Sequence, residues 1–584
     1  MRDVIELTKE QIDFLDVEGK VVLCAVPGSG KTFIVAKKIL KYLNAWPLSH
    51  RGIAALSFTN VASGEIKRQA SELSSRFTSV SYPHFIGTLD SFIDKYIILR
   101  FGYLMQKENR TRPHIIHENY GELDFFSRDA RCYRRMCTQH PEWFHWSSDC
   151  LLKENKAIDC DVNPKPCVTY KKTLIKRGII TQREVPALAL ILLRRYPQIA
   201  TELAYRFPVI IVDEAQDTSR EQIEILDCIA NAGTQTIILV GDPDQALYEW
   251  RDATPEYFIK KMQETGWNCM YLTVNFRSSK LICDAVKPFS SMLEGKEPAT
   301  ASGENSGFKV KPVLLRVTKD KQRQDIVDWF INTCRNNNIE ISSNSISVLT
   351  RGRIHSDLVL DIWKTPETKS LAMASYFWHC SNRKEAYRLC EKVLYSIEIG
   401  NAGGLTQSEI RQKAETLIPP AKWNSSIMTL LRCLPAPNLS VGVWKKILID
   451  EVEKLIHSGI ITSYDGRQVS EIVKVKLRDK KHPEFLNRAL IAYFESRAAL
   501  DISISSVHGV KGETFDATLL IVDSIKGANA LTPTILETGD LNSELIRIAY
   551  VAMTRPRKLL AVSIPKRDVQ LSRFPVDLWD YCDL

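Results

Sequence analysis

Residues 25–32 read Ala-Val-Pro-Gly-Ser-Gly-Lys-Thr and directly follow the apolar run Val21-Val22-Leu23-Cys24. The next residues have the spacing of a helix, with apolar side chains at Val35, Ile39 and Leu43. A glycine-rich turn between a strand and a helix points backbone N–H groups at phosphate oxygens. Although Ala25 stands where the strict pattern has glycine, this context favours a phosphate-binding loop over a fortuitous glycine turn.

An acidic motif later in the chain supplies the partner that such a loop needs. The apolar run 210–212 leads into Asp213-Glu214-Ala215-Gln216-Asp217. In a triphosphate site Lys31 reaches the β- and γ-phosphates, while Thr32 and Asp213 hold magnesium. Glu214 would polarise the attacking water. The two motifs predict a nucleoside triphosphatase with ATP and Mg²⁺ as cofactors. The expected cradle for the phosphates comprises Pro27, Gly28, Ser29, Gly30, Lys31 and Thr32.

The composition is that of a globular protein with several domains. The chain has 584 residues, of which 44% are hydrophobic and 25% charged. Its net charge of +9 permits nucleic-acid binding without proving it. The N-terminus lacks the pattern of a signal peptide, and the longest apolar stretch, 185–193, is about half a membrane span. We therefore expect a cytoplasmic protein with no membrane partner.

The cysteines raise the question of a metal site. In a reducing compartment most of the 14 cysteines should be free thiols. Five of them crowd one region beside His140 and His145, namely Cys132, Cys137, Cys150, Cys160 and Cys167. A zinc or iron–sulfur site is one interpretation of this cluster. Because no CxxC pair occurs there, buried or scattered thiols are the favoured alternative.

Short apolar runs that end in polar residues recur along the chain and are typical of buried parallel strands. They lie at 21–24, 53–56, 209–212, 237–240, 346–349, 519–522 and 559–562. The runs fall into two sets, which predicts two parallel α/β units. The segment 101–207 lacks such runs, and the segment 357–500 alternates breakers with helical stretches such as 384–399 and 443–457. We expect two mainly helical insertions there, and a flexible loop at the polar stretch 295–306.

Further motifs follow the phosphate loop in a recognisable order. They are Leu56-Ser57-Phe58-Thr59-Asn60, Gly87-Thr88-Leu89-Asp90-Ser91-Phe92, the acidic motif, Gly241-Asp242-Pro243-Asp244-Gln245-Ala246-Leu247-Tyr248-Glu249-Trp250-Arg251, Asn275-Phe276-Arg277-Ser278, Val507-His508-Gly509-Val510-Lys511-Gly512-Glu513 and Tyr550-Val551-Ala552-Met553-Thr554-Arg555. Together these motifs resemble the superfamily 1A helicases of the UvrD, Rep and PcrA type. The resemblance implies an α/β fold with two RecA-like motor domains. The implied limits are 1–100 and 208–270 for domain 1A, 101–207 for insertion 1B, 271–356 and 501–584 for domain 2A, and 357–500 for insertion 2B.

The resemblance implies that the γ-phosphate is contacted from three regions of the chain. Gln245 would supply an amide, and Arg277 and Arg555 would supply two guanidinium groups. Because both arginines belong to the second α/β unit, the nucleotide would lie in the cleft between the units. ATP binding would then close this cleft, and hydrolysis would release it.

The resemblance also implies contacts with the rest of the nucleotide. Gln11 would read the adenine, Phe276 would stack on it, and Glu513 would contact the ribose. Gln11 has a second interpretation, because Thr8 and Gln11 fit a capping box in which the glutamine closes a helix N-terminus.

Several aromatic residues match family positions that stack against DNA bases. They are Phe58, Tyr248 and Trp250, and stacking suits a motor that ignores sequence, because every base offers a π-face. The alternative is that these rings belong to the core, although the charged neighbours of Trp250 make a buried strand improbable. The remaining predicted DNA contacts are Thr59, Asn60, Thr88, Arg251 and His508. Asp90 stands where relatives have a histidine, which puts an acid near the expected DNA path.

The resemblance implies an ATP-dependent translocase that moves 3′ to 5′ along single-stranded DNA and separates forked DNA. The alternative is an ATP- and DNA-sensing regulatory subunit that gates a partner nuclease and unwinds little. The segment 505–514 resembles helicase subunits of two-gene antiphage systems of the Gabija type, in which the partner is an OLD-family nuclease. A third hypothesis, a signalling ATPase without a nucleic-acid ligand, is disfavoured by Tyr248 and Trp250.

Overall fold

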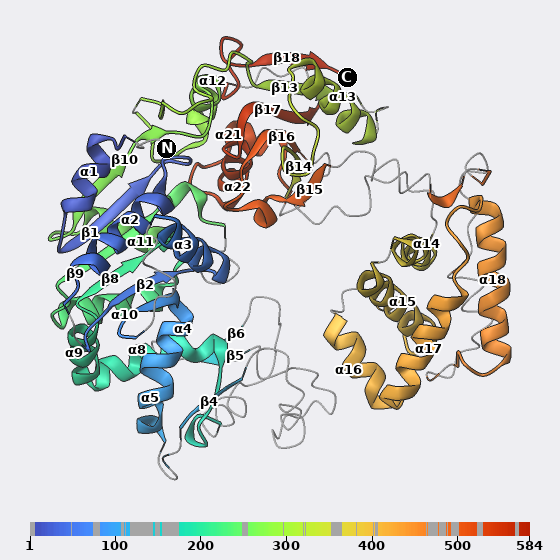
Figure 1. Ribbon diagram of the computed structural model, residues 1–584, viewed down its shortest axis with the longest axis horizontal. Helices are drawn as coiled ribbons and strands as arrows, with labels where there is room; N and C mark the ends of the chain where they lie inside the picture. Colours follow the sequence, from blue (N-terminus) through green and yellow to red (C-terminus); the bar gives the residue numbers. More distant parts are fainter. Residues whose placement is uncertain are drawn as a thin grey trace.

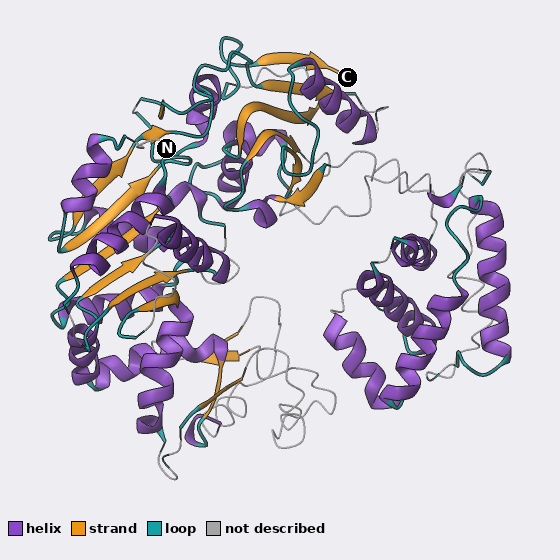
Figure 2. Cartoon of the chain, viewed as in Figure 1, coloured by secondary structure: helices purple, strands orange, loops and turns teal. Residues whose placement is uncertain are grey.

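The architecture was analysed in a computed structural model. The structure describes residues 6–47, 50–73, 82–106, 174–247, 255–351, 365–462, 502–522, 530–566 and 572–584, with gaps at 296, 319–320, 322, 381, 401 and 403–406, and short pieces of 107–173 and 463–501. Two six-stranded parallel sheets organise it, and Figures 1 and 2 show a group of helices from residues 366–457 that stands apart from both sheets. The predicted α/β fold with two parallel-sheet units is confirmed.

The first sheet has the strand order β10-β1-β9-β8-β2-β3, and all of its pairs are parallel. Its strands are β1 (Lys20–Ala25), β2 (Ile53–Ser57), β3 (Phe85–Thr88), β8 (Val209–Val212), β9 (Thr236–Gly241) and β10 (Asn268–Leu272). Strand β1 is buried on both sides, since its alternate residues enter two different hydrophobic cores, and β2, β8 and β9 are buried along their whole length. This explains why the strands read as continuous apolar runs. Its main helices are α1 (Lys9–Asp16), α2 (Lys31–Ala45), α3 (Asn60–Leu73), α10 (Arg220–Asn231) and α11 (Pro255–Gln263).

The second sheet has the order β15-β14-β16-β17-β13-β18 and is also parallel throughout. Its strands are β13 (Val313–Val317), β14 (Ile346–Thr350), β15 (Ser503–Ser506), β16 (Phe515–Ile521), β17 (Pro556–Pro565) and β18 (Asp580–Asp583). Two cores again lie on its faces. The helices of this unit are α12 (Lys280–Val286), α13 (Arg323–Asn336), α21 (Pro533–Thr538) and α22 (Glu544–Met553). Strands β14 and β15 are neighbours although a long segment separates them in sequence.

The described part of segment 101–207 combines helices with short strands. Helices α8 (Val185–Arg195) and α9 (Pro197–Arg206) pack into the core of the first sheet. Strands β4 (His114–Ile116) and β7 (Ile179–Thr181) form a parallel pair, and β5 (Phe144–Trp146) and β6 (Leu152–Glu154) an antiparallel one. The sequence analysis, which expected a mainly helical insertion, did not predict these strands, because three-residue strands are too short to produce an alternating pattern. The cysteine cluster of this segment lies outside the described residues.

The segment 357–500 contributes a helical unit with a hydrophobic core of its own. Its helices are α14 (Pro366–His379), α15 (Arg383–Glu398), α16 (Gln407–Leu417), α17 (Pro420–Cys433) and α18 (Val441–His457). Two of them, α15 and α18, match the helical stretches expected from the sequence within two residues at each end. No helix in the described part of the chain has the length and apolarity that crossing a membrane requires.

Part of the stretch 295–306, expected to be a loop, forms a strand instead. Strand β12 (Thr300–Ala301) pairs in parallel with β11 (Val274–Asn275). A Cβ added to Gly303 would lie only 1.9 Å from the carbonyl oxygen of Phe276, so the two backbones are in close contact. The polar composition did not indicate this pairing, because the partner strand lies in another motif.

Candidate nucleotide-binding site

The turn between β1 and α2 has the backbone that a phosphate cradle requires. Gly28 and Gly30 have φ angles of +77° and +75°, which side chains rarely permit. A Cβ at Gly28 would also lie 2.6 Å from Asn275 Oδ1. The Ser29 hydroxyl is buried and has no hydrogen-bond partner among the described residues. The turn therefore combines left-handed glycines with a buried hydroxyl that no described residue contacts by a hydrogen bond.

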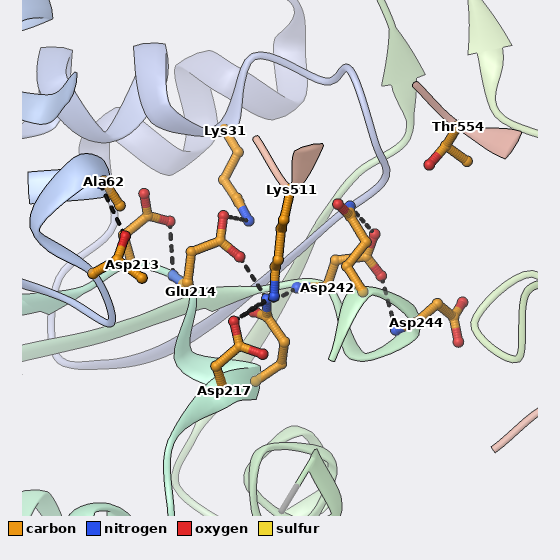
Figure 3. Close-up of polar contacts among 12 residues, drawn as sticks. Lys31, Ala62, Asp213, Glu214, Asp217, Asp242, Asp244, Lys511 and Thr554 are labelled. Atoms are coloured by element: carbon orange, nitrogen blue, oxygen red, sulfur yellow. Dashed lines mark hydrogen bonds and ion pairs between the residues drawn. The ribbon is translucent and has the colours of Figure 1, made fainter. Parts of the chain in front are cut away.

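The acidic motif faces this turn from the end of β8. Glu214 Oε1 accepts a hydrogen bond from Lys31 Nζ at 2.7 Å, and this ion pair appears in Figure 3. The backbone N–H of Glu214 donates to Asp213 Oδ1 at 2.9 Å. Glu214 has a φ of +55°, a strained conformation for a residue with a side chain, which costs of order 1–3 kcal/mol. Such strain persists only where the surroundings hold the residue, and it is frequent at active sites.

Burial and charge set the ionisation of these groups. Burial lowers the pKa of Lys31, but the charges of Glu214 and Asp213 outweigh burial and raise it. Burial raises the pKa of Glu214, and the charges of Lys31 and Lys511 reverse this and lower it. For Asp213 burial dominates over the charge of Lys31, so its pKa is raised. Lys31 and Glu214 are thus a charged pair at neutral pH, whereas Asp213 is a carboxyl that a cation would stabilise in its charged form.

One cavity of about 610 Å³ lies between the two α/β units. From the first unit its lining includes Gly28, Gly30, Lys31, Thr32, Asp213, Glu214 and Gln245. From the second unit, or from the chain just before it, come Arg277, His508, Lys511, Glu513 and Arg555. The structure therefore brings both predicted arginines into the cavity that contains Lys31.

A chain of hydrogen bonds connects the two units across this cavity. Arg555 Nη2 donates to Gln245 Oε1 at 2.7 Å, and Gln245 Nε2 donates to Asp242 Oδ2 at 2.6 Å. Arg277 Nη1 donates to the carbonyl of Thr554 at 3.0 Å. Burial lowers the pKa of Arg277, and the charge of Arg555 lowers it further. Because two buried guanidinium groups repel each other, an anion placed between them would be favoured.

A buried ion pair between the units was missed by the sequence analysis. Lys511 Nζ lies 2.5 Å from Asp217 Oδ2, and the two side chains are 10% and 1% exposed. Figure 3 shows Lys511 reaching Asp217 beside Glu214. Both residues stand in quoted motifs, but their separation of 294 positions leaves no local pattern that would pair them.

Both interpretations of Gln11 have a counterpart in the geometry. Its side chain and that of Thr8 form the capping box of α1, with hydrogen bonds of 3.2 Å in each direction. Gln11 Nε2 also donates to the carbonyl of Ser29, so the cap contacts the phosphate loop.

The other two residues predicted to contact the nucleotide lie near the same turn or cavity. Phe276 is half-buried, and its N–H donates to the carbonyl of Gly28 at 2.8 Å. Glu513 is exposed and lines the cavity. The adenine and ribose roles stay predictions.

The predicted DNA contacts are placed in different ways. Phe58, Thr59 and His508 line the same cavity as Lys31. Thr88 is a buried N-cap whose hydroxyl accepts the Ser91 N–H at 3.1 Å, so it has a structural role of its own. Asn60 begins α3, and Asp90 accepts a hydrogen bond from Gln222. Outside the described residues lie Tyr248, Trp250 and Arg251.

Nothing in the described residues resembles a site built from histidine, cysteine and several carboxylates. No group of three or more His, Cys, Asp and Glu side chains there could hold a metal ion. Among the oxygen donors that line the cavity, Thr32, Asp213 and Glu214 belong to the glycine turn and the acidic motif. A hydroxyl and carboxylates suit a Mg²⁺ ion that arrives with phosphate oxygens as its other ligands.

Fold and site together define a protein of two parallel α/β units with a cavity between them that is lined by a glycine turn and an acidic motif. Residues 7–134 and 147–265 match the model of the UvrD/REP helicase N-terminal domain. This match confirms the resemblance of the first part of the chain to the UvrD/REP helicases that the motifs predicted.

Similarity to individual proteins extends this resemblance along the chain. The chain is 23% identical to Gabija protein GajB of Bacillus cereus over 95% of its own length and 94% of that protein. It is 20% identical to a probable DNA helicase II homolog of Mycoplasma pneumoniae, over 95% of the chain and 83% of the relative. It is 24% identical to the ATP-dependent DNA helicase Rep of Escherichia coli, over 46% of the chain and 41% of Rep. The chain spans about half the length or less of the Rep proteins that it matches.

Proposed function

We propose that this chain is an ATP-dependent translocase that moves 3′ to 5′ along single-stranded DNA and unwinds forked DNA. The observation that carries the proposal is the single cavity lined by Lys31 of one unit and Arg277 and Arg555 of the other. A ligand that contacts both units favours their closed arrangement, and its hydrolysis removes that preference. The helicase-type relatives support DNA as the track.

The residues at the cavity fit ATP with Mg²⁺. The left-handed glycines suit phosphate oxygens, and Thr32 and Asp213 would hold the cation. When bound, the cation would neutralise charge on the β- and γ-phosphates. Lys31 would exchange its ion pair with Glu214 for a phosphate oxygen.

That exchange would free Glu214 to orient water. The charge of Lys511 would still oppose the effect of burial on its pKa and favour the carboxylate form, which can accept a hydrogen bond from water. Gln245 already connects Asp242 of the first unit to Arg555 of the second. A γ-phosphate beside Gln245 would therefore be detected by both units at once.

A second function is favoured by the similarity to Gabija protein GajB over 95% of the chain. In this alternative the chain is the ATP- and DNA-sensing subunit of an antiphage complex, and it gates a nuclease of the OLD family while unwinding little on its own. The two functions share the nucleotide site. In the first, cleft closure drives movement along DNA, and in the second it gates the partner nuclease.

The nucleotide assignment is tested with Lys31→Ala. Loss of this ammonium should abolish DNA-stimulated ATP hydrolysis, whereas binding of nucleotide-free protein to single-stranded DNA should persist. Lys41→Ala is a matched control on the same helix, because Lys41 forms an ion pair with Asp16 whose side chains are 52% and 72% exposed. Such exposed pairs contribute about 0–1 kcal/mol. Continued turnover in Lys31→Ala would refute the site.

Forked DNA separates the two functions. A translocase should unwind a fork with a 3′ single-stranded tail and leave one with a 5′ tail intact. ATP hydrolysis that depends on DNA, combined with no unwinding of either fork, would favour the regulatory alternative. Hydrolysis that ignores single-stranded DNA would exclude both.

A further inference from the structure

Helix α1 connects the phosphate loop to the strand that precedes Phe276. At its amino end, Gln11 Nε2 donates to the carbonyl of Ser29 at 3.2 Å. The neighbouring Glu10 carboxylate accepts the N–H and the hydroxyl of Thr273 at 2.8 and 2.6 Å. Thr273 directly precedes β11, and Phe276 directly follows that strand. The amino end of α1 therefore carries one of the two predicted adenine contacts and is attached to the chain that carries the other.

The carboxyl end of α1 is held by a side chain from the next helix. Lys38 of α2 donates through Nζ to the carbonyl of Leu15 at 2.9 Å and also to the carbonyl of Val17. The last carbonyls of a helix have no partner within it, and the helix dipole favours a cation beside them. Within α1 itself no residue of the last turn is basic, so this cation comes from α2.

The ammonium of Lys38 is buried, in contrast to the second lysine at this helix end. The Lys38 residue is 1% exposed, and its Nζ lies 5.7 and 5.3 Å from the ring centroids of Phe14 and Tyr42. Lys41 also donates to Leu15, at 2.9 Å, but its side chain is 52% exposed. Water can replace an exposed donor, whereas loss of a buried one leaves carbonyls without a partner. The position of this helix end therefore depends mainly on Lys38.

Helix α2 connects this contact to the phosphate loop. It begins at Lys31, directly after the loop, and Lys38 follows about two helical turns later. The loop is thus attached to α1 twice, through the hydrogen bond between Ser29 and Gln11 and through α2 to the carboxyl end. Because α1 has only eight residues and moves as one rigid element, a shift at its carboxyl end would displace its amino end. The position of Gln11 at the loop therefore depends on Lys38.

We infer that Lys38 is a positioning residue that holds α1, and with it Gln11, against the phosphate loop, so that adenine binding depends on the ammonium charge of Lys38. This inference rests on the proposed ATP-driven function and on the adenine contact predicted for Gln11. Lys38 need not touch the nucleotide, because it acts through the backbone of α1.

The charge of Lys38 responds to pH close to neutrality. Burial, together with the charge of Lys41, lowers the pKa of Lys38 to about 8, although the charges of Glu18 and Asp16 oppose the shift. Tyr42, which faces the ammonium from α2, stays neutral in this range, because burial raises its pKa to about 12. The ammonium is therefore present below about pH 8 and is lost as the pH rises through that value.

The first test compares the pH dependence of ATP hydrolysis in the unchanged chain and in Lys38→Arg. A neutral amine can still donate hydrogen bonds, but bonds from a charged donor are roughly twice as strong. We expect KM for ATP in the unchanged chain to rise at least about threefold between about pH 7 and about pH 9.5. In Lys38→Arg it should rise less, because a guanidinium binds its proton more tightly than an ammonium by about two pKa units or more. Titration of Arg277, whose pKa burial lowers to about 9, is common to both proteins and cancels in the comparison.

The second test removes the charge of Lys38 at a single pH. Methionine resembles the apolar stem of lysine and suits the aromatic rings around it, so Lys38→Met should fold with a nearly unchanged thermal midpoint. KM for ATP should rise at least about tenfold with kcat nearly unchanged, because α1 would contribute equally to binding of the ground state and of the transition state. The ratio of kcat/KM for ATP to that for GTP should fall by a similar factor. The matched control is Lys41→Met, which removes an exposed contact with the same helix end and should change neither quantity.

The outcomes separate this inference from the proposed function. An unchanged KM for ATP and an unchanged preference over GTP in Lys38→Met would overturn the inference. A KM that changes with pH to the same extent in the unchanged chain and in Lys38→Arg would also overturn it, even if Lys38→Met failed to fold. Either result with Lys31→Ala inactive would leave the nucleotide site standing, whereas an active Lys31→Ala would refute the site itself.

Discussion

Removal of the ion pair between Lys511 and Asp217 should uncouple the two units without unfolding either. The pair joins the acidic motif of the first unit to the second unit, and both side chains are at most 10% exposed. In Lys511→Met the Asp217 carboxylate stays buried beside Glu214 and loses its ion-pair partner, so that the charge of Lys31 is left to act on it. The variant should therefore impair closure of the cleft between the two units. Each unit should stay folded, because it keeps its own hydrophobic cores.

The size of the effect follows from the geometry. At 2.5 Å, Coulomb's law with an effective dielectric constant of about 20 gives an attraction of about 7 kcal/mol. Desolvation of both groups offsets part of this attraction, and removal of one partner of a buried pair typically costs about 3–5 kcal/mol. A loss of about 3 kcal/mol corresponds to a reduction of roughly 100-fold or more in kcat/KM.

A double-mutant cycle on DNA-stimulated ATP hydrolysis measures this coupling. Lys511→Met and Asp217→Asn should each lower kcat/KM strongly, and the double variant should be little worse than the poorer single variant. The control cycle uses Arg316 and Asp583, an exposed pair within the second unit. It should leave kcat/KM unchanged. Single effects that add within about 0.5 kcal/mol would refute the reasoning, because independent sites add to within that margin.

Two further outcomes are expected. Gly28→Ala should lose ATP binding in a fluorescent-nucleotide titration, because the new Cβ would lie 2.6 Å from Asn275 Oδ1 at a φ of +77°. Binding with the affinity of the unchanged chain would contradict the phosphate cradle. The control is Gly233→Ala, because Gly233 also has a positive φ and its Cβ would meet nothing within 4 Å. Burial raises the pKa of Asp213, so its carboxylate is present above that pKa and is lost as the pH falls through it. Mn²⁺ binding, followed by electron paramagnetic resonance, should therefore weaken at a higher pH than the value near 4 at which an ordinary aspartate titrates. Binding that stays constant down to that value would contradict the raised pKa.

Much of the fold and part of the site could be predicted because the determinants are local. A strand buried on both faces must be a run of apolar residues, and all seven runs named from the sequence are strands in the structure. The phosphate loop needs glycines at fixed positions between a strand and a helix, and Gly28 and Gly30 have the required left-handed backbone. The capping box of Thr8 and Gln11 is likewise contained in four consecutive residues.

The sequence by itself therefore determined the strands, the glycine cradle and the order of the motifs, since each depends on neighbouring residues. Only the tertiary structure decided which motifs meet: Lys511 with Asp217, Asp244 with Ser290 and Ser291, and β12 with β11. These contacts join residues far apart in the chain, and the polar groups that make them can also form hydrogen bonds with water in the unfolded chain. Their pairing is fixed when the apolar cores place the two units side by side, because burial then leaves each polar group one set of partners.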